Sequence, residues 1–437
     1  MASALEWSDS ILEPAVECMP RQDLDAYHDE KLAELGRLSY GQAPLITKLW
    51  DGAGVRPADI RGRADFTAKV PFLTKDVIRD YRSATGAPFG GLERRGLTAL
   101  DGVFTSSGTT GDATFFAEEW PRGWSPHWIG ATRALYGAGI RPGDYILAGS
   151  SGMRGPQSHL AQLLGAVPIY ADVFNDGWPK VLEIIERYRP AFMTLVGITA
   201  VGLAELSRTV DIERAFSCFK VIGFAGEPLG AAMRARFASW NIELLTWSTA
   251  GDVALCFECP QHNGLHMWED TGFFEVLDVE TGEPVADGRV GELISTSLCN
   301  TIAPLVRYRT EDLVRVTREQ CACGRTHARQ WPLGRLGDLI IVRGVSVTPG
   351  EVWRAVESVP ETSAGVFQIV KTGSRMAELK IRVGYDQATA PDLADLRRRL
   401  NTAIWAELKI EPNLELMTTG QLLATSATGK IKRVANA

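Results

Sequence analysis

Small and hydroxyl-bearing residues fill the segment Thr105-Ser106-Ser107-Gly108-Thr109-Thr110-Gly111. Glycines let a backbone turn several N–H groups toward one point, and Ser and Thr hydroxyls add further donors. Such a turn can wrap the oxygens of a polyphosphate. It is not a Walker loop, because no Gly-Lys-Ser/Thr follows it. The same composition also fits an ordinary surface loop, so the residues that accompany the segment decide its meaning.

Four further segments could complete a nucleotide site. Gly226-Glu227-Pro228 follows an apolar strand, and Asp312 follows a strand-like segment where a carboxylate could grip ribose hydroxyls. Arg335 lies in the Gly334–Asp338 stretch, and Lys430 lies close to the C-terminus. Each is weak alone, since a lysine near a chain end is usually solvated.

A second constellation has the chemistry of a metal site. Cys321-Ala322-Cys323-Gly324 is a tight turn that offers two thiolates, and Cys259 and His266 lie upstream. Three Cys and one His are a soft, closed ligand set suited to structural Zn²⁺. His262 and His327 are rival nitrogen donors, and Cys256 is a rival thiol. Seven cysteines in 437 residues are too sparse for a disulfide framework.

The chain is long enough for two or three domains, and its 45% hydrophobic and 23% charged residues are ordinary for globular protein. Between about residues 100 and 250, short apolar runs alternate with helical stretches, which predicts a mostly parallel sheet flanked by helices. Helix is also expected near residues 23–38, with a cap at Thr74 before a second helix. The strands expected in this part are 145–148, 167–170, 192–196 and 219–223, and the helices are 157–164, 179–188, 199–206 and 229–240.

The pattern changes after residue 270. Strand-like segments at 273–279, 291–295 and 313–316 are separated by Gly-rich turns, which favours a small antiparallel subdomain. The tail alternates strands (339–342, 365–371, 379–383) with helices (351–358, 391–408). We therefore predict an α/β protein with a large N-terminal domain at 1–336 and a small α+β domain at 337–437.

Composition also excludes some functions. The formal net charge of −7 gives no support for a nucleic-acid or anionic-membrane partner. No apolar run approaches the ~20 residues of a membrane span. Glu6, Asp9 and Glu13 give the N-terminus the wrong charge for a signal peptide, so a cytoplasmic location is expected.

Taken in order, these motifs resemble the adenylate-forming superfamily of acyl-CoA synthetases, adenylation domains and luciferases. Within it, the chain looks most similar to the phenylacetate–CoA ligase-like family. The similarity runs from about residue 65 to the C-terminus. The segments that carry it are Pro71–Asp76, Ser106–Gly111, Gly264–Asp270, Gly291-Glu292-Leu293, Pro304–Thr310 and Gly334–Pro349.

The resemblance implies a two-step ligase. A carboxylate attacks the α-phosphorus of ATP to give an acyl-adenylate and pyrophosphate, and the thiol of coenzyme A then displaces AMP. Ser106 to Gly111 would hold the phosphates with Mg²⁺, Gly226, Glu227 and Pro228 would flank adenine, and Asp312 would hold the ribose beside Arg335. Lys430 would bridge the carboxylate and the α-phosphate, with Thr249 as a further catalytic candidate. The small domain would rotate between the steps about a hinge near Gly337.

The family resemblance extends to zinc and to the acid pocket. Zinc-bearing members have ligands in segments that correspond to Cys259, His266, Cys321 and Cys323. Pocket candidates are Met153, His159, Phe224 and Trp247, with core packing as the alternative for about half of the candidates. Trp247 suggests a flat aromatic acid.

The chain departs from the family at three points. Asp112 stands where relatives commonly carry Lys after the phosphate loop, Gly337 stands at an often acidic hinge position, and Gly251 stands where they carry an acid, with Asp252 next to it. Two other functions therefore stay open. One is adenylation followed by transfer to a carrier-protein phosphopantetheine or an amine, and the other is a nucleotide-binding or zinc-stabilised interaction protein without turnover. The resemblance also allows a homodimer, although no sequence feature establishes one.

Overall fold

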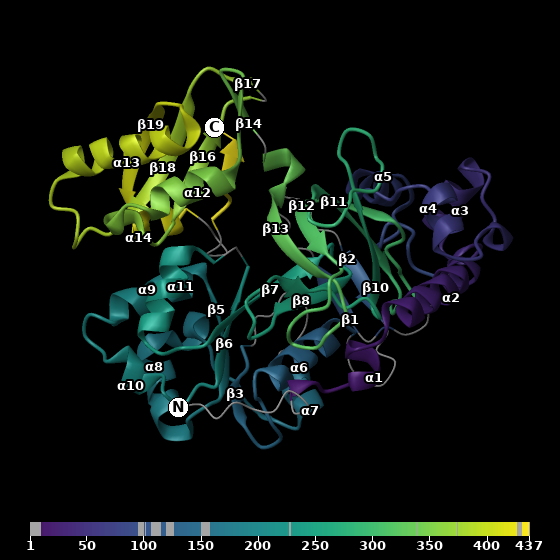
Figure 1. Cartoon of the computed structure of the whole chain (residues 1–437), viewed down its shortest axis with the longest axis horizontal. Helices are drawn as coiled ribbons and strands as arrows, with labels where there is room; N and C mark the ends of the chain where they lie inside the picture. The colour runs from purple at the N-terminus through teal and green to yellow at the C-terminus, as the bar shows by residue number, and fades with distance from the viewer. Residues whose placement is uncertain are drawn as a thin grey trace. The chain divides into compact units, whose positions relative to one another are not determined.

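The computed structural model describes residues 10–94, 100, 102–105, 115–118, 126–149, 158–226, 229–338, 340–373, 375–425 and 431–436. The chain forms two compact units. The first contains residues 1–181, 190–192 and 247–331, and the second contains residues 182–189, 193–246 and 332–437. The element labels below are those of Figure 1.

Antiparallel strands dominate the first unit. Its strand order is β10-β11-β12-β13-β9-β8-β7. The antiparallel pairs are β10 with β11, β11 with β12, β13 with β9, β9 with β8, and β8 with β7. These strands are β7 (Leu244–Ala250), β8 (Ala254–Glu258), β9 (Leu265–His266), β10 (Gly272–Leu277), β11 (Val290–Ser297), β12 (Tyr308–Thr317) and β13 (Arg329–Arg335). β7 and β13 cross the boundary between the units.

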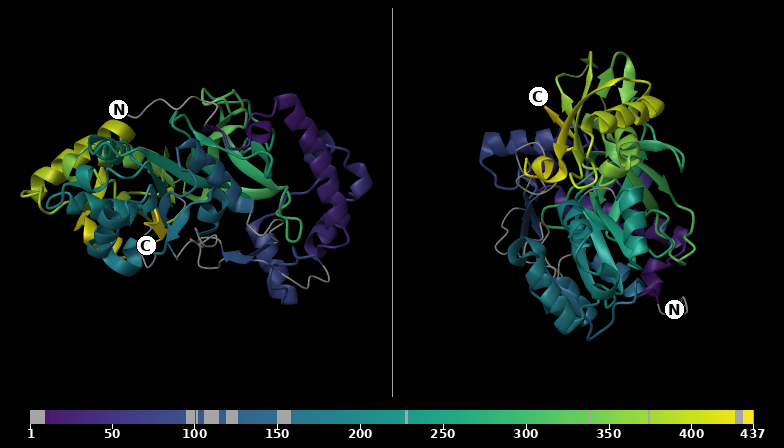
Figure 2. Two further views of the ribbon diagram at one scale, coloured as in Figure 1. Left: turned by 90° about the horizontal axis from the view of Figure 1, so that it is seen from below. Right: turned by 90° about the vertical axis from the view of Figure 1, so that its left-hand side faces the viewer.

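The same unit carries the N-terminal helices and a small parallel pair of strands. The helix α2 (Arg21–Ser39) lies beside the antiparallel strands, as the purple helix in the left view of Figure 2 shows. Its core-facing side contributes to a large apolar cluster that also contains Trp50, Phe66 and Tyr308. The remaining elements are α1 (Pro14–Glu17), α3 (Pro44–Gly52), η2 (Pro57–Asp59), α4 (Arg63–Lys69), α5 (Lys75–Thr85), the hairpin β1 (Gly102–Thr105) with β2 (Phe115–Glu118), α6 (Pro126–Gly137), β3 (Tyr145–Leu147), α7 (Ser158–Leu164) and β4 (Val167–Ile169).

The second unit begins with β–α repeats. The strands β5 (Phe192–Val196) and β6 (Val221–Ala225) are neighbours, and β6 runs parallel to the start of β7. The helices α9 (Gly197–Leu206) and α11 (Ala231–Ser239) follow β5 and β6, with α10 (Ile212–Ala215) between them. α8 (Val173–Tyr188) precedes β5 and is kinked at Gly177, where φ is +74°.

The described part of the segment after residue 336 has a three-stranded sheet, a four-stranded sheet and a core of its own. Its apolar cluster runs from Ile340 to Val434, and α12 (Pro349–Glu357) and α13 (Leu393–Leu408) pack side by side against its strands (Figure 2). Thr348 starts α12 with a capping box, since its hydroxyl accepts the Glu351 N–H and its own N–H donates to the Glu351 carboxylate. The other elements are η3 (Leu336–Asp338), β14 (Ile340–Val342), β15 (Val345–Val347), η4 (Pro360–Thr362), β16 (Phe367–Lys371), β17 (Arg375–Met376), β18 (Leu379–Tyr385), β19 (Pro412–Thr418), α14 (Thr419–Leu423) and β20 (Val434–Asn436).

The predicted α/β class is confirmed, with a parallel part and an antiparallel part as expected. Thr74 caps α5, because its hydroxyl accepts the Val77 N–H at 3.3 Å. The domain boundary near residue 336 stays a prediction. The division into compact units places residues 193–246 together with the tail. This division does not show which part of the chain rotates.

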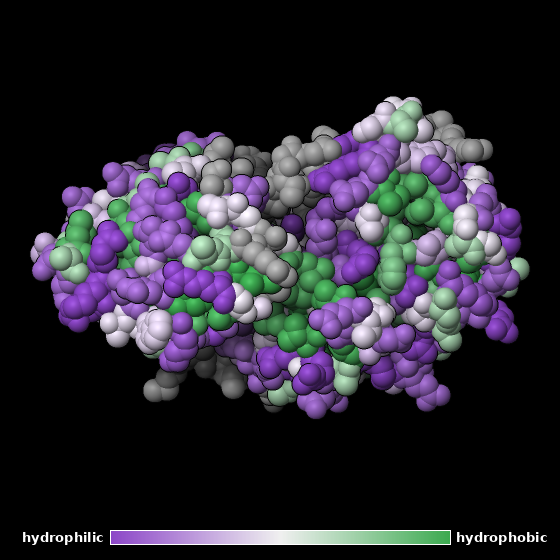
Figure 3. Space-filling model, turned by 90° about the horizontal axis from the view of Figure 1, so that it is seen from above, coloured by the Kyte–Doolittle hydropathy of each residue, from purple (hydrophilic) through white to green (hydrophobic). Residues whose placement is uncertain are grey.

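Hydrophilic residues cover much of the face shown in Figure 3, with apolar patches between them. None of the helices in the described part of the chain combines the length and apolar composition that a membrane crossing requires.

Candidate adenylation site and metal centre

Three cysteines and one histidine converge in the first unit. The ligand atoms of Cys259, His266, Cys321 and Cys323 all lie within 4.8 Å of one another. The Sγ atoms of Cys259 and Cys321 are 3.8 Å apart, and Cys323 Sγ is 3.4 Å from His266 Nε2. All four side chains are buried. We call these four residues the metal cluster; they are the set that the sequence predicts.

Short turns hold the ligands in place. Cys259 comes directly after β8, and a turn follows it because the His262 N–H donates to the Cys259 carbonyl. In the second turn the Gly324 N–H donates to the Cys321 carbonyl, and Gly324 adopts φ +90°, which favours glycine. His266 lies on β9, which pairs with both β8 and β13. Pairing of distant strands therefore brings the two turns together.

The rival donors lie outside the metal cluster. His327 Nδ1 accepts the Glu269 N–H at 2.9 Å, and its Nε2 lies 2.9 Å from the Val16 carbonyl. Cys256 Sγ accepts a hydrogen bond from Gln330 at 3.2 Å. His262 Nδ1 is 3.4 Å from a Glu258 carboxylate oxygen. The geometry thus separates the four predicted ligands from the other candidates.

The electrostatics of the metal cluster suit a cation. Burial lowers the pKa of His266, which keeps the imidazole neutral. The hydrogen bond with Cys259 lowers the pKa of both Cys321 and Cys323, so these two sulfurs favour the thiolate form. Arg325 Nη1 lies 3.7 Å from Cys323 Sγ, and its positive charge favours the thiolate form of that sulfur. Three thiols and one imidazole in a buried group fit a tetrahedral zinc ion and leave no position for a reacting water.

Asp312, the predicted ribose ligand, lies on a β-bulge of the first unit. Glu292 of β11 pairs with Leu313 of β12, whereas Ile294, two residues further on, pairs with Arg309. Three residues of β12 therefore face one residue of β11, and we call Thr310–Asp312 the bulge. Bulges re-aim side chains and occur often beside active sites.

The family's acid position, Gly251, has no room for a side chain. A Cβ atom built there would lie 2.2 Å from Thr310 Cγ2 and 2.3 Å from Ser295 Oγ. Gly251 and Asp252 both adopt left-handed backbone, with φ of +55° and +62°. The missing acid thus reflects a turn whose space is filled by neighbours, and Asp252 is the carboxylate that this turn carries.

Two pocket candidates and Thr249 also belong to the first unit. Trp247 lies between Trp128 and Phe257, with ring centroids 6.2 and 5.0 Å away. Among the described residues, its buried Nε1–H has no hydrogen-bond partner. His159 lies on α7, where burial lowers the pKa of its ring. Thr249 lies on β7, and its carbonyl accepts a hydrogen bond from Gln330.

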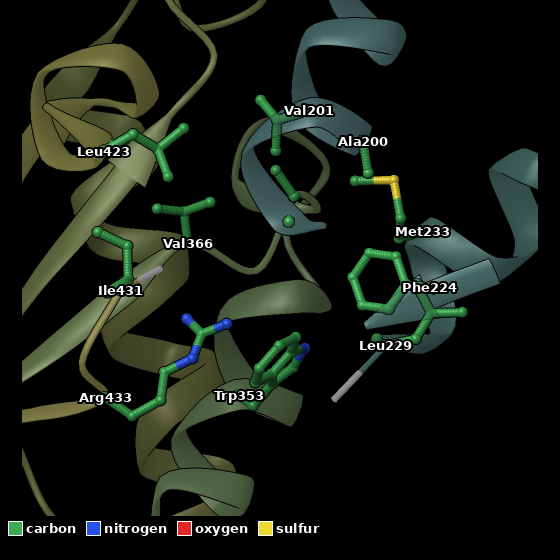
Figure 4. Close-up of a pocket in the computed structure, with 13 residues that line it drawn as sticks. Ala200, Val201, Phe224, Leu229, Met233, Trp353, Val366, Leu423, Ile431 and Arg433 are labelled. Carbon is green, nitrogen blue, oxygen red and sulfur yellow. The ribbon is translucent and has the colours of Figure 1, made fainter. Parts of the chain in front are cut away.

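The remaining described candidates belong to the second unit. Gly226 follows β6 directly and adopts φ +91°, and Arg335 is the last residue of β13. Phe224 of β6 lines a pocket with about 390 Å³ of empty space that is open to solvent (Figure 4). The pocket wall is apolar except where the Arg433 guanidinium lies 3.9 Å over the Trp353 ring. Phe224 is thus both a packing residue and a pocket residue.

Several predicted site residues lie outside the described residues. These are Ser106, Ser107, Gly108, Thr109, Thr110, Gly111, Glu227, Pro228, Met153 and Lys430. Their roles stay predictions.

Sequence reasoning missed the carboxylate and guanidinium that flank the bulge. Glu292 and Arg309 belong to motifs that carry the family resemblance, but the sequence alone assigns no function to either residue. Only the pairing register shows that they meet, so no sequence signal could have assigned them.

Comparisons with known proteins show what the whole chain is similar to. The phenylacetate–coenzyme A ligase of Thermus thermophilus is 31% identical over an alignment that covers 97% of this chain and 99% of that enzyme. The Escherichia coli enzyme of the same name is 29% identical and matches 79% of this chain and 78% of its own length. A crystal structure of 2-hydroxyisobutyryl-CoA ligase in the postadenylation state superposes with a TM-score of 0.82 at 24% identity, covering 97% of this chain and 92% of that one. No family model matches the sequence.

The fold and the sequence together define an AMP-forming acid–thiol ligase of the adenylate-forming class. Within that class, the chain belongs to the phenylacetate–coenzyme A ligase family.

Proposed function

We propose that the protein activates an aromatic carboxylic acid with ATP and transfers the acyl group to coenzyme A. The observation that carries the proposal is the match to the Thermus thermophilus phenylacetate–coenzyme A ligase, which extends along nearly the whole of both chains. The products would be an aryl-CoA thioester, AMP and pyrophosphate.

The chemistry needs two anions held together. A carboxylate oxygen of the acid forms a bond to the α-phosphorus of ATP, and the bond from that phosphorus to the pyrophosphate oxygen breaks. The coenzyme A sulfur then attacks the acyl carbon, loses its proton, and AMP leaves with its electron pair. Fixed positive charge at the α-phosphate stabilises the charge that develops in the first step. We assign this task to Lys430, the phosphate contacts to Ser106–Gly111, and the ribose contact to Asp312.

The aromatic part of the proposal rests on Trp247. Its ring packs against the tilted rings of Trp128 and Phe257, and we take the indole face as a flat wall of the acid pocket. Its indole N–H is buried and is not bonded to any described residue, so it can donate to a polar substituent or to the carboxylate. A flat wall with one donor suits a substituted aromatic acid.

Two metal ions complete the proposal. The metal cluster would hold zinc, and the ion would tie the 259–266 segment to the 321–323 turn. Mg²⁺ is expected on the phosphates, where it neutralises the leaving pyrophosphate.

The test is pyrophosphate release from ATP with a panel of aromatic and aliphatic acids, followed by AMP release with coenzyme A as acceptor. We expect release with an aromatic acid and a faster AMP release when coenzyme A is added. Release with small aliphatic hydroxy acids alone would contradict the aromatic assignment. Unchanged AMP release with coenzyme A, but acceleration by an amine or a carrier protein, would contradict the acceptor.

A matched variant tests the pocket. Trp247→Phe keeps the flat ring and removes the N–H donor. We expect a higher KM for the acid and an unchanged KM for ATP, because the nucleotide contacts lie elsewhere. The aromatic wall would be wrongly placed if the KM for the acid did not change.

A further inference from the structure

Two sequence motifs of the first unit have no role in the proposed reaction. Gly291-Glu292-Leu293 lies on β11, and Pro71–Asp76 leads into α5. Both lie against the β12 segment that carries Asp312, because Glu292 faces the bulge and Leu73 bridges to Tyr308. Their residues could therefore control the direction of the Asp312 carboxylate.

The bulge is a strained piece of backbone that needs support. Glu311 adopts φ +63°, a left-handed conformation that is unfavourable for a non-glycine residue. In addition, the N–H groups of bulge residues do not have the cross-strand partners that a regular strand ladder provides. A bulge in this state persists only where its surroundings fix it.

Glu292 binds the strained residue and the residue that precedes the bulge. Its carboxylate accepts hydrogen bonds from Arg309 Nε at 3.0 and 3.2 Å and is also bonded to Arg309 Nη2. One of its oxygens accepts the Glu311 N–H at 3.2 Å. Glu292 is 1% exposed, so this carboxylate is buried against the bulge and not solvated. It connects the residue before the bulge to the middle of the bulge.

Thr310 supplies the second support. Its hydroxyl donates to the Leu293 carbonyl at 2.8 Å and accepts the Asp312 N–H at 3.0 Å. The backbone of Asp312 is therefore tied, through one buried hydroxyl, to the motif that contains Glu292.

The Pro71–Asp76 motif fixes the entry to the bulge. The Arg309 N–H donates to the Leu73 carbonyl at 2.8 Å, and the Leu73 N–H donates to the Arg307 carbonyl at 3.1 Å. The Phe72 ring lies under both guanidiniums, 4.2 Å from that of Arg307 and 5.6 Å from that of Arg309. Arg309 is therefore held between a ring and a carboxylate, which limits its rotation.

We propose that Glu292 is a positioning residue for the nucleotide: through Arg309 and the Glu311 N–H it holds the bulge so that Asp312 presents its carboxylate to the ribose hydroxyls. This inference rests on the proposed function, because it takes Asp312 as the ribose ligand. The bonds of the Glu292 carboxylate to described residues go to Arg309 and Glu311, which favours control of the bulge over a general role in sheet stability.

The experiment is equilibrium binding of ATP, 2′-deoxy-ATP and 3′-deoxy-ATP to the full chain, which needs no knowledge of the acid. A hydrogen bond from a hydroxyl to a carboxylate is worth about 10-fold or more in affinity, so the wild type should bind ATP more tightly than the deoxy nucleotide that lacks the bonded hydroxyl. Glu292→Gln should weaken ATP binding by about 10-fold. The ratio of its affinity for ATP to its affinity for the deoxy nucleotide should come close to the ratio in Asp312→Asn. The double variant should be no weaker than Asp312→Asn, because both changes remove the same interaction.

Glu269→Gln is the matched control. Glu269 is also a buried carboxylate of the first unit, and it pairs with Arg21 and with the Ala328 N–H. Its variant should lose stability but keep the nucleotide ratio. A Glu292→Gln protein that keeps the wild-type ratio, while Asp312→Asn loses it, overturns the positioning role and leaves the proposed function standing. A wild type without ATP binding, or an Asp312→Asn protein with the wild-type ratio, overturns both.

A second pair of variants covers the case in which Glu292→Gln does not fold. Thr310→Val removes both hydroxyl bonds to the bulge, and Thr310→Ser keeps them. We expect the first to reduce the nucleotide ratio and the second to retain it. Equal ratios in the two proteins would overturn the proposal.

Discussion

At the scale of single residues, Gly251 explains how the chain can lack an acid that its family commonly carries. The position is left-handed, and its Cβ space is filled by Thr310 and Ser295. Thr310 belongs to the bulge that carries Asp312, so the turn at Gly251 and the predicted ribose site share one set of packed atoms. A side chain at position 251 would overlap these atoms, so the glycine fits the packing of this turn.

Gly251→Ala tests this packing. We expect a loss of unfolding free energy of about 2 kcal/mol or more, because left-handed strain and steric overlap add. Gly54→Ala is the control, since Gly54 has φ +70° but nothing within 4 Å of its Cβ position. Denaturant unfolding of both proteins gives the difference. Equal losses would mean that the space at Gly251 is not filled as described.

His28 predicts the direction of a pH effect. Burial lowers the pKa of this ring, whose Nε2 lies 2.6 Å from the Glu269 carbonyl. Below the ordinary histidine pKa of ~6.5 the unfolded chain takes up a proton that folded His28 refuses. Stability should therefore fall as pH falls below ~6.5, by up to ~1.4 kcal/mol per pH unit for this group, until the lowered folded pKa is reached.

His28→Gln checks that effect. The amide can still donate to the Glu269 carbonyl but does not titrate. The slope of unfolding free energy against pH should be shallower in the variant below pH ~6.5 and unchanged near pH ~8. Parallel curves over the whole range would show that His28 does not carry the effect.

Sequence reasoning succeeds at residues whose chemistry is visible in the residue type. Cysteines and histidines in short turns point to a metal site but leave His262, His327 and Cys256 open, and the family resemblance selects the ligands Cys259, His266, Cys321 and Cys323. Glu292 could not be found, because a glutamate on a strand is ordinary. Its meaning comes from a shift in strand register, which is a tertiary property.

At the scale of elements, the predicted helices and strands from residue 145 onward match the structure closely where apolar periodicity is strong. The strand at 192–196 and the helix at 391–408 are examples, and the latter is α13, which is capped by Asp392 and ends at the left-handed Lys409. Short pieces such as β15 and β17 escaped prediction, because two or three residues carry no period.

The helix α11 depends on a carboxylate from a distant part of the sequence. Glu357 of α12 accepts the Ala231 N–H at 3.0 Å and the Ala232 N–H at 2.6 Å, both within the second unit. Gly230 leaves room for it, since a Cβ there would lie 2.1 Å from Glu357 Oε1. Glu357 therefore caps the N-terminus of α11, because it accepts two N–H groups that have no partner within the helix.

Glu357→Ala should free these two amides. We expect a stability loss of about 1 kcal/mol and faster hydrogen exchange at Ala231 and Ala232. Glu357→Gln retains an acceptor oxygen and should show a smaller change. Unchanged exchange in the alanine variant would contradict the capping role.

The metal cluster links elements that are far apart in sequence. If it holds zinc, the purified protein should contain about one zinc per chain, and a strong chelator should lower its melting temperature. Cys323→Ser should reproduce the loss, whereas Cys299→Ser, at a cysteine outside the metal cluster, should not. Metal analysis and thermal unfolding measure both. A metal-free protein with an unchanged melting temperature after chelation would contradict a zinc site.

At the scale of the whole molecule, residues 340–434 have an apolar core of their own, while the division into a large and a small domain at residue 336 stays a prediction. The sequence could indicate this core because its composition and element order differ from what precedes it. It could not indicate that residues 193–246 are grouped with this tail, since compactness depends on packing between distant segments. Which segments rotate during the reaction stays a prediction, with Gly337 of η3 as the proposed hinge.

The most direct test of the account is ATP–pyrophosphate exchange by the wild type and by Lys430→Ala. The account predicts exchange that depends on an aromatic acid, a fall of about 100-fold or more in Lys430→Ala, and little change in Lys432→Ala, which removes a neighbouring exposed lysine. No exchange with any acid, or equal exchange in Lys430→Ala and the wild type, would contradict it.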